Sequence, residues 1–242
     1  MKQKDQLHCK RLVVGSATHL QIEEVADFYL LYHDRDRHEL IHFLRKQDYI
    51  NVFRSRRLGI VKGFVTMKRF HIQLQGSKAI VIYPGLGVIN PTYRGQYIVE
   101  RTGLKEYLAA KIRHPLTKCY FALTVLSHFG YRKIYRSVST VWPHPIHKTP
   151  KDIQYLIDHA GEYLSAPGRW DSENGIIRGF DSKRLKRSAA ALTSSRLADP
   201  IVRYFINRNP GYESGDTLLC IARLTLYTAL PTFGKPRKEG RI

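Results

Sequence analysis

Cysteine is scarce in this sequence: Cys9, Cys119 and Cys220 stand far apart among 242 residues and form no CxxC pair. That spacing excludes a disulfide framework and a cysteine zinc site. No apolar run approaches the length of about 18 residues that a membrane-spanning helix needs. The first residues are polar and lack the apolar core of a secretion signal. We therefore expect a protein of the reducing cytoplasm.

Acidic residues are also few, with 20 Asp and Glu against 40 Lys and Arg, which gives a net charge of +20. The charged fraction of 25% and the apolar fraction of 43% are ordinary for a folded protein, so wholesale disorder is excluded. A strongly cationic protein is expected to meet an anionic partner. Composition alone leaves open a nucleic acid, an anionic membrane, an acidic protein and a phosphorylated small molecule.

The spacing of apolar residues predicts a chain of mixed helices and strands. Thr18 and Thr149 are predicted to cap helices, and the stretch 1–234 is predicted to fold as one domain with a core at 11–126, an elaborated C-terminal half at 127–234, and a basic tail at 235–242. The predicted strands are 12–14, 50–53, 60–72, 78–89, 118–126, 176–180 and 217–227. The predicted helices are 19–32, 37–47, 97–113, 127–136, 151–164, 183–195 and 199–207.

The most informative segment lies where the predicted strand 78–89 gives way to a helix. Pro84-Gly85-Leu86-Gly87 interrupts the strand, which favours a bulge or a place where a ligand approaches the backbone. The polar turn after it, 90–96, would present free amides at the start of the next helix, and such amides favour a phosphate. Arg94 and Gly95 sit where that phosphate would lie. An ordinary strand–turn–helix corner with a solvated arginine is the alternative.

The run Val88-Ile89-Asn90-Pro91-Thr92-Tyr93-Arg94-Gly95-Gln96 resembles the central motif of the GCN5-related N-acetyltransferase (GNAT) superfamily. The resemblance implies an α/β (α+β) fold with a mixed, mostly antiparallel sheet, splayed at the donor site and flanked by helices. It also implies acyl transfer from a pantetheine thioester to an amine. By this resemblance, the pantetheine arm would be lined by Leu86, Gly87, Val88 and Ile89. The donor phosphate would lie against Arg94, Gly95, Gln96 and Tyr97.

The turn departs from the family pattern at two positions, where Tyr97 and Val99 replace small residues. Bulky side chains there would crowd a diphosphate held by backbone amides. Either coenzyme A binds in a shifted pose, or the donor is a phosphopantetheine arm on an acyl carrier protein. Carrier proteins are acidic, which suits a charge of +20. No tightly bound cofactor is implied, because acyl-CoA or acyl-ACP serves as a co-substrate.

The chemistry needs a base for the amine, an oxyanion site and an acid for the departing thiolate. In the family the acid is often a tyrosine beyond the next strand, which here places Tyr135 as the acid, with Tyr131 second. The strand end also offers Ser127 and His128, with His128 as the base. With 15 tyrosines and 11 histidines, such residues also occur at a strand end by chance. If the segment around Tyr204 is the true equivalent, 127–198 is an insertion and Tyr204 becomes the acid.

Two other patterns suggest different function classes. His38-Glu39-Leu40-Ile41-His42 matches the HExxH motif of zinc proteases, which also needs a third ligand. No Glu occurs between Glu39 and Glu100, no histidine completes the extended HExxHxxGxxH pattern, and the flanks are highly charged, so we interpret it as a polar helix start without metal. The basic runs 54–69 and 183–187 lack a helix-turn-helix, RNP or zinc-finger signature. They leave a cationic nucleic-acid-binding protein without turnover as the alternative, and the second run would suit an anionic membrane surface.

The sequence thus predicts an N-acyltransferase. The apolar, aromatic C-terminal half would suit a fatty acyl chain, and the acceptor would be the amine of an amino acid, a peptide or a lipid precursor.

Overall fold

The computed structural model describes residues 5–74, 76–93, 98–138, 140–179 and 193–225. Within these ranges the strands are β1 (Leu7–Val13), β2 (Tyr49–Ser55), β3 (Val61–Leu74), β4 (Ser77–Ile89), β5 (Lys118–Val125), β6 (Val141–Trp142), β7 (Trp170–Asp171), β8 (Ile176–Ile177) and β9 (Thr217–Leu224). The helices are α1 (His19–Leu30), α2 (Arg37–Arg45), α3 (Ile98–Arg113), α4 (His128–Ser137), α5 (Lys151–Leu164), α7 (Ser194–Leu197) and α8 (Pro200–Arg208). Short 3-10 turns are η1 (Val14–Ser16), η2 (Pro91–Tyr93) and η3 (Tyr212–Ser214).

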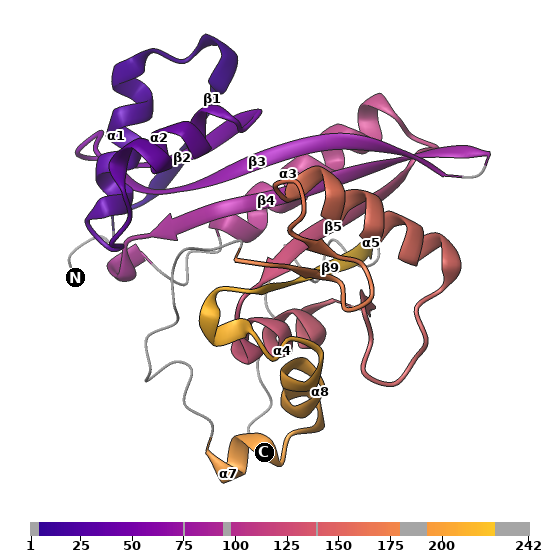
Figure 1. Ribbon diagram of the computed structural model, residues 1–242. Helices are drawn as coiled ribbons and strands as arrows, with labels where there is room; N and C mark the ends of the chain where they lie inside the picture. The colour runs from indigo at the N-terminus through magenta and orange to yellow at the C-terminus, as the bar shows by residue number, and fades with distance from the viewer. Residues whose placement is uncertain (1–4, 75, 94–97, 139, 180–192, 226–242) are drawn as a thin grey trace.

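All the described strands belong to one sheet, in the order β1-β2-β3-β4-β5-β9-β8-β7, with β6 also paired to β9 (Figure 1). The pairing of β4 with β5 is parallel, and the other described pairings are antiparallel. Parallel neighbours need a crossover, and α3 supplies it between β4 and β5. The predicted fold class, a mixed and mostly antiparallel sheet flanked by helices, is confirmed.

Helices cover both faces of the sheet (Figure 1). On one face α1 and α2 pack over β2 and β3, and α5 packs over the far end of β3 and over β4, β5 and β9. On the other face α3 packs over the middle of the sheet, and α4 and α8 pack over the ends of β5 and β9. Alternation along each strand divides its side chains between these two layers.

Two helices begin where the sequence predicts. Thr18 caps α1, as predicted, by a reciprocal pair of hydrogen bonds with Gln21, and α8 begins after Asp199, whose side chain accepts from the Ile201 amide. Strands β2 to β5 agree with the predicted ranges to within a few residues.

Three predictions of local structure were wrong or incomplete. The first strand begins at Leu7 rather than residue 12, because its polar residues pair in register with β2 and conceal the strand from an apolar pattern. The residue that precedes α5 is Pro150, without a side-chain cap, rather than Thr149. The strand predicted at 176–180 covers two residues of β8. Most of the helix predicted at 183–195, and the basic tail, lie outside the described residues.

Candidate functional site

The two parallel strands at the centre of the sheet separate after a short common stretch. Their pairing ends at Ile82 opposite Phe121. Beyond that point β4 continues to Ile89 along β3, while β5 continues to Val125 along β9. In the described part of the chain, the edge of β4 beyond Ile82 therefore has no strand partner on the β5 side. This is the splay that the sequence predicted for the donor site.

A bulge in β4 begins at the splay. In the register with β3, Pro84 lies opposite Met67 and Gly87 lies opposite Val65, so Gly85 and Leu86 share the space opposite Thr66 alone. Two residues against one define a β-bulge. A Cβ added at Gly85 would lie 2.7 Å from the Thr66 hydroxyl oxygen, so the close approach of the two strands requires glycine.

Beyond the bulge, alternate residues of β4 turn their backbone groups towards β3 and away from it. The Asn90 amide donates to the Lys62 carbonyl of β3 at 2.8 Å. Since the backbone groups of alternate residues point to the same edge of a strand, Val88 also faces β3, while Gly87 and Ile89 face the diverging β5. Residues 84–89 are also partly or fully exposed, unlike the buried stretch before them. Their N–H and C=O groups are available to an extended ligand.

The four residues predicted to line the pantetheine arm all lie on this part of β4. Leu86 and Val88 pack towards α1 and α2, and Ile89 packs towards α3. Gly87 is exposed. The four predicted phosphate residues, Arg94, Gly95, Gln96 and Tyr97, lie outside the described residues.

The catalytic candidates follow the other arm of the splay. Ser127 caps α4, because its hydroxyl accepts a hydrogen bond from the Gly130 amide at 3.2 Å. His128 is 1% exposed, and its ring centroid lies 4.2 Å from that of Phe129. Neither nitrogen of His128 has a hydrogen-bond partner among the described residues. Burial lowers the pKa of His128, and the positive charge of Arg196 lowers it further.

Tyr135 lies near the other end of α4 from His128. Its half-buried ring is 5.3 Å from the ring of His144 and 6.4 Å from that of Tyr131, measured between centroids. The two alternative tyrosines lie near it. Tyr131 is fully buried and donates to the Pro143 carbonyl at 2.7 Å, so its hydroxyl proton already has an acceptor. Tyr204 projects from α8 with its ring 5.7 Å from that of Tyr131, and burial raises its pKa.

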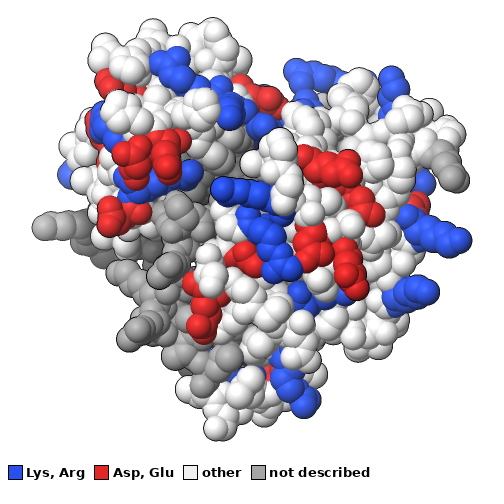
Figure 2. Space-filling view, in the orientation of Figure 1, with Lys and Arg blue, Asp and Glu red and all other residues white. Residues whose placement is uncertain are grey.

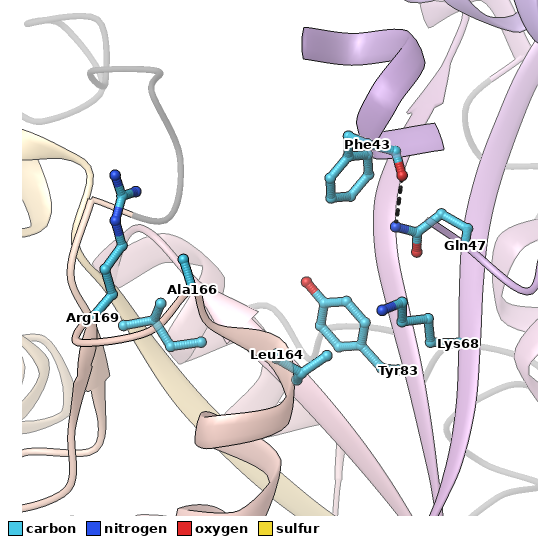
Figure 3. Close-up of a pocket in the computed structure, with 8 residues that line it drawn as sticks. Phe43, Gln47, Lys68, Tyr83, Leu164, Ala166 and Arg169 are labelled. Carbon is cyan, nitrogen blue, oxygen red and sulfur yellow. Dashed lines mark hydrogen bonds between the residues drawn. The ribbon is translucent and has the colours of Figure 1, made fainter. Parts of the chain in front are cut away.

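Sequence reasoning missed a group of residues on the face that carries α2 and α5. A cavity of about 190 Å³ opens there beside the splay (Figure 3). Its lining comprises Phe43, Gln47, Lys68, Tyr83, Leu164, Ala166, Arg169 and Ile177. The pairing of Lys68 with Tyr83 across β3 and β4 forms its floor. The strand register was the missing information, since these residues are far apart in the sequence.

The structure gives no further support to the patterns that suggested other functions. His38, Glu39 and His42 are exposed on α2, and the described residues hold no cluster of three or more metal-ligating side chains. Among the described helices none is long and apolar enough to cross a membrane. On the face of the molecule drawn in Figure 2, acidic groups are interspersed with basic ones, and no continuous basic stripe is seen among the described residues.

Comparison with known proteins gives matches of fold only. No family model matches the chain, and no curated protein matches its sequence. Among solved structures, a ribosomal-protein-alanine N-acetyltransferase from Brucella melitensis is 16% identical with a TM-score of 0.39, over 60% of this chain and 99% of that one. A GNAT family N-acetyltransferase from Escherichia coli, in complex with CoA, is 13% identical with a TM-score of 0.36, over 52% and 66%.

A third similar structure is a conserved protein from Enterococcus faecalis described as a probable N-acyltransferase. It is 17% identical with a TM-score of 0.37 over 53% of this chain. The match spans 31% of the length of the Enterococcus protein.

Proposed function

We propose that this chain is a GNAT-type N-acyltransferase, which moves an acyl group from a phosphopantetheine thioester to an amine. The observation that carries the proposal is the β4 edge beyond Ile82, where the bulge and the diverging β5 leave backbone groups of Gly87 and Ile89 without a strand partner among the described residues. A pantetheine arm is extended and carries two amides. It can therefore hydrogen-bond to that edge as an added strand does.

The reaction is an aminolysis of the thioester. The neutral amine nitrogen forms a bond to the thioester carbonyl carbon, and the carbon–sulfur bond then breaks. The products are an amide and a free thiol, with the proton lost by the amine balanced by the proton gained by the thiolate. We assign the protonation of the thiolate to Tyr135 and leave Ser127 and His128 as candidates for the remaining proton transfer.

The turn after β4 leaves two donors open. With the bulky Tyr97 and Val99 there, either coenzyme A binds in a shifted pose or the donor is the phosphopantetheine arm of an acyl carrier protein, so both donors belong in every test. The apolar C-terminal half supports a fatty acyl chain. A charge of +20 supports docking of an acidic carrier protein.

The test is thiol release from a panel of donors. Acetyl- to palmitoyl-CoA and the matching acyl carrier proteins are offered with mixed amines, and the amide product is identified by mass. Release with one donor class is the expected result. Arg94→Gln should then weaken donor binding, whereas the exposed Arg113→Gln at the end of α3 should not.

A different result would overturn the proposal. If no donor releases thiol, and the protein instead binds nucleic acid with a steep dependence on salt, the chain is a cationic binding protein without turnover.

A further inference from the structure

The cavity beside the splay has the size of a small molecule. It lies between the end of α2 and the end of α5, with Lys68 and Tyr83 on its floor (Figure 3). Its volume is about 190 Å³. A protein cavity of about 150 Å³ holds one benzene. The cavity is therefore large enough for a compound of amino-acid size and too small for a folded peptide segment.

Two cations line this cavity, and the ammonium of one of them, Lys68, lies over the ring of Tyr163, 5.1 Å from its centroid. Lys68 and Arg169 line it, and none of its lining residues carries a carboxylate. None of the ion pairs among the described residues includes either side chain. One guanidinium nitrogen of Arg169 donates to the Gly179 carbonyl at 2.9 Å, which leaves further N–H groups for a ligand. Such a wall favours an anionic group.

The cavity also holds a buried acceptor that lacks a donor. Gln47 is 6% exposed, and its Nε2 donates to the Phe43 carbonyl at 3.0 Å. Its Oε1 has no hydrogen-bond partner among the described residues. Figure 3 shows this oxygen on the side of Lys68 and Tyr83. An unpaired buried acceptor is costly, so an N–H donor supplied by a ligand would stabilise it.

The unpaired oxygen lies at the splay itself. A Cβ built on Gly85, the first residue of the bulge, would be 3.6 Å from Gln47 Oε1. The acceptor end of the cavity is therefore next to the strand edge assigned to the donor. The cationic end includes Arg169, which follows α5 on the opposite wall.

We infer that this cavity binds the acyl acceptor, and that the acceptor is a small amine with an acidic group, a carboxylate or a phosphate, at its other end. Gln47 faces the amine beside the bulge, while Lys68 on the same side and Arg169 on the opposite wall attract the acidic group. This inference rests on the proposed acyl transfer and specifies its substrate class. The positive charge of Lys68 also favours the neutral form of the amine, which is the form that attacks the thioester.

Matched pairs of amines test the inference. Alanine is compared with alaninamide, and O-phosphoethanolamine with ethanolamine, because each pair differs in the acidic group. Thiol release is measured with the donor that the panel identifies, and binding without donor is measured by calorimetry. The acidic member of at least one pair should be preferred, and which pair responds distinguishes a carboxylate from a phosphate.

Substitutions then locate the binding site. Lys68→Met should raise the KM of the acidic amine by about ten- to a hundredfold, with a smaller change in kcat. Arg169→Gln should act in the same direction but more weakly, since its side chain is exposed. The controls are Lys118→Met at the start of β5 and Arg113→Gln at the end of α3, both exposed and outside the cavity lining.

The outcomes separate the inference from the proposed function. Equal use of both members of each pair overturns the inference and leaves acyl transfer standing. Absence of thiol release with every donor and amine overturns the proposed function. In that event, calorimetric binding of the acidic amine that Lys68→Met abolishes would still support the anion site, and absence of such binding would overturn it.

Discussion

The hydroxyl oxygens of Tyr83 and Thr124 lie 3.2 Å apart and join β4 to β5 just beyond the last backbone pairing of these strands. Tyr83 follows the last paired residue of β4, and Thr124 lies three residues beyond the last paired residue of β5. A side-chain hydrogen bond therefore spans the strands where the main chains begin to diverge. Tyr83 also lies on the floor of the cavity, so the contact fixes one side of the candidate acceptor site.

A double-mutant cycle measures this contact. Tyr83→Phe and Thr124→Val each remove one hydroxyl, and each should lower the free energy of unfolding by about 1 kcal/mol. If the hydrogen bond forms in solution, the double variant should lose less than the sum, with a coupling energy of about 0.5–1.5 kcal/mol. Urea unfolding of the four proteins gives these values. Strict additivity would show that the two hydroxyls do not interact.

Gly85→Ala tests the close packing at the bulge. The new methyl would lie 2.7 Å from the Thr66 hydroxyl oxygen and 3.2 Å from a ring carbon of Tyr83. Since Thr66 is fully buried, its side chain or the strand that carries it must shift, and we expect a loss of about 1–3 kcal/mol in the free energy of unfolding. Thr66→Ala removes the nearest atom, so it should recover part of the loss when the two substitutions are combined.

Gly15→Ala is the matched control for that substitution. No atom lies within 4 Å of a Cβ built there, and alanine should be tolerated without loss. An equal effect of alanine at both glycines would contradict the close packing at the bulge. It would point instead to a general cost of replacing glycine in this chain.

Much of the fold is predictable because local signals and the fold agree. Thr18 has a capping partner three residues ahead, and the apolar run 79–83 becomes the buried part of β4. The first strand shows the limit of such signals. Cys9 and Arg11 belong to β1 because they pair with Phe53 and Asn51 of β2, far away in the sequence, and an edge strand with mixed polarity has no periodic apolar pattern.

The candidate site likewise has one part that the sequence predicts, the bulge, and one part that it does not, the cavity. The bulge was predictable because proline and glycine interrupt an apolar strand at 84–87, which is a local signal. The cavity was not, because Gln47, Lys68 and Arg169 meet through strand register and through the packing of α5 on the sheet. A single sequence carries no direct sign of strand register or of the packing of a helix on a sheet.

Tyr135→Phe tests the assignment of the acid. Loss of the phenol should lower kcat by about 10²–10⁴-fold, the usual contribution of a general acid, with little change in donor affinity. Tyr131→Phe is the comparison, since the Tyr131 hydroxyl donates to the Pro143 carbonyl. That substitution should lower the free energy of unfolding by about 1 kcal/mol and leave kcat close to the wild-type value. If Tyr204→Phe rather than Tyr135→Phe removes activity, the acid lies on α8.

His128 should make the folded state sensitive to acid. Burial, and then the charge of Arg196, hold its pKa below the ordinary value, so the unfolded chain binds the proton more readily than the folded one. The stability that results is present above the unfolded pKa of about 6.5 and is lost as the pH falls below it towards the folded pKa. While only the unfolded state is protonated, the loss reaches about 1.4 kcal/mol per pH unit. His128→Phe should flatten this part of the profile of unfolding free energy between pH 7 and 5, measured by urea titration, relative to the wild type. Parallel profiles for the two proteins would show that His128 takes up its proton as easily in the folded state, contrary to its burial at the start of α4.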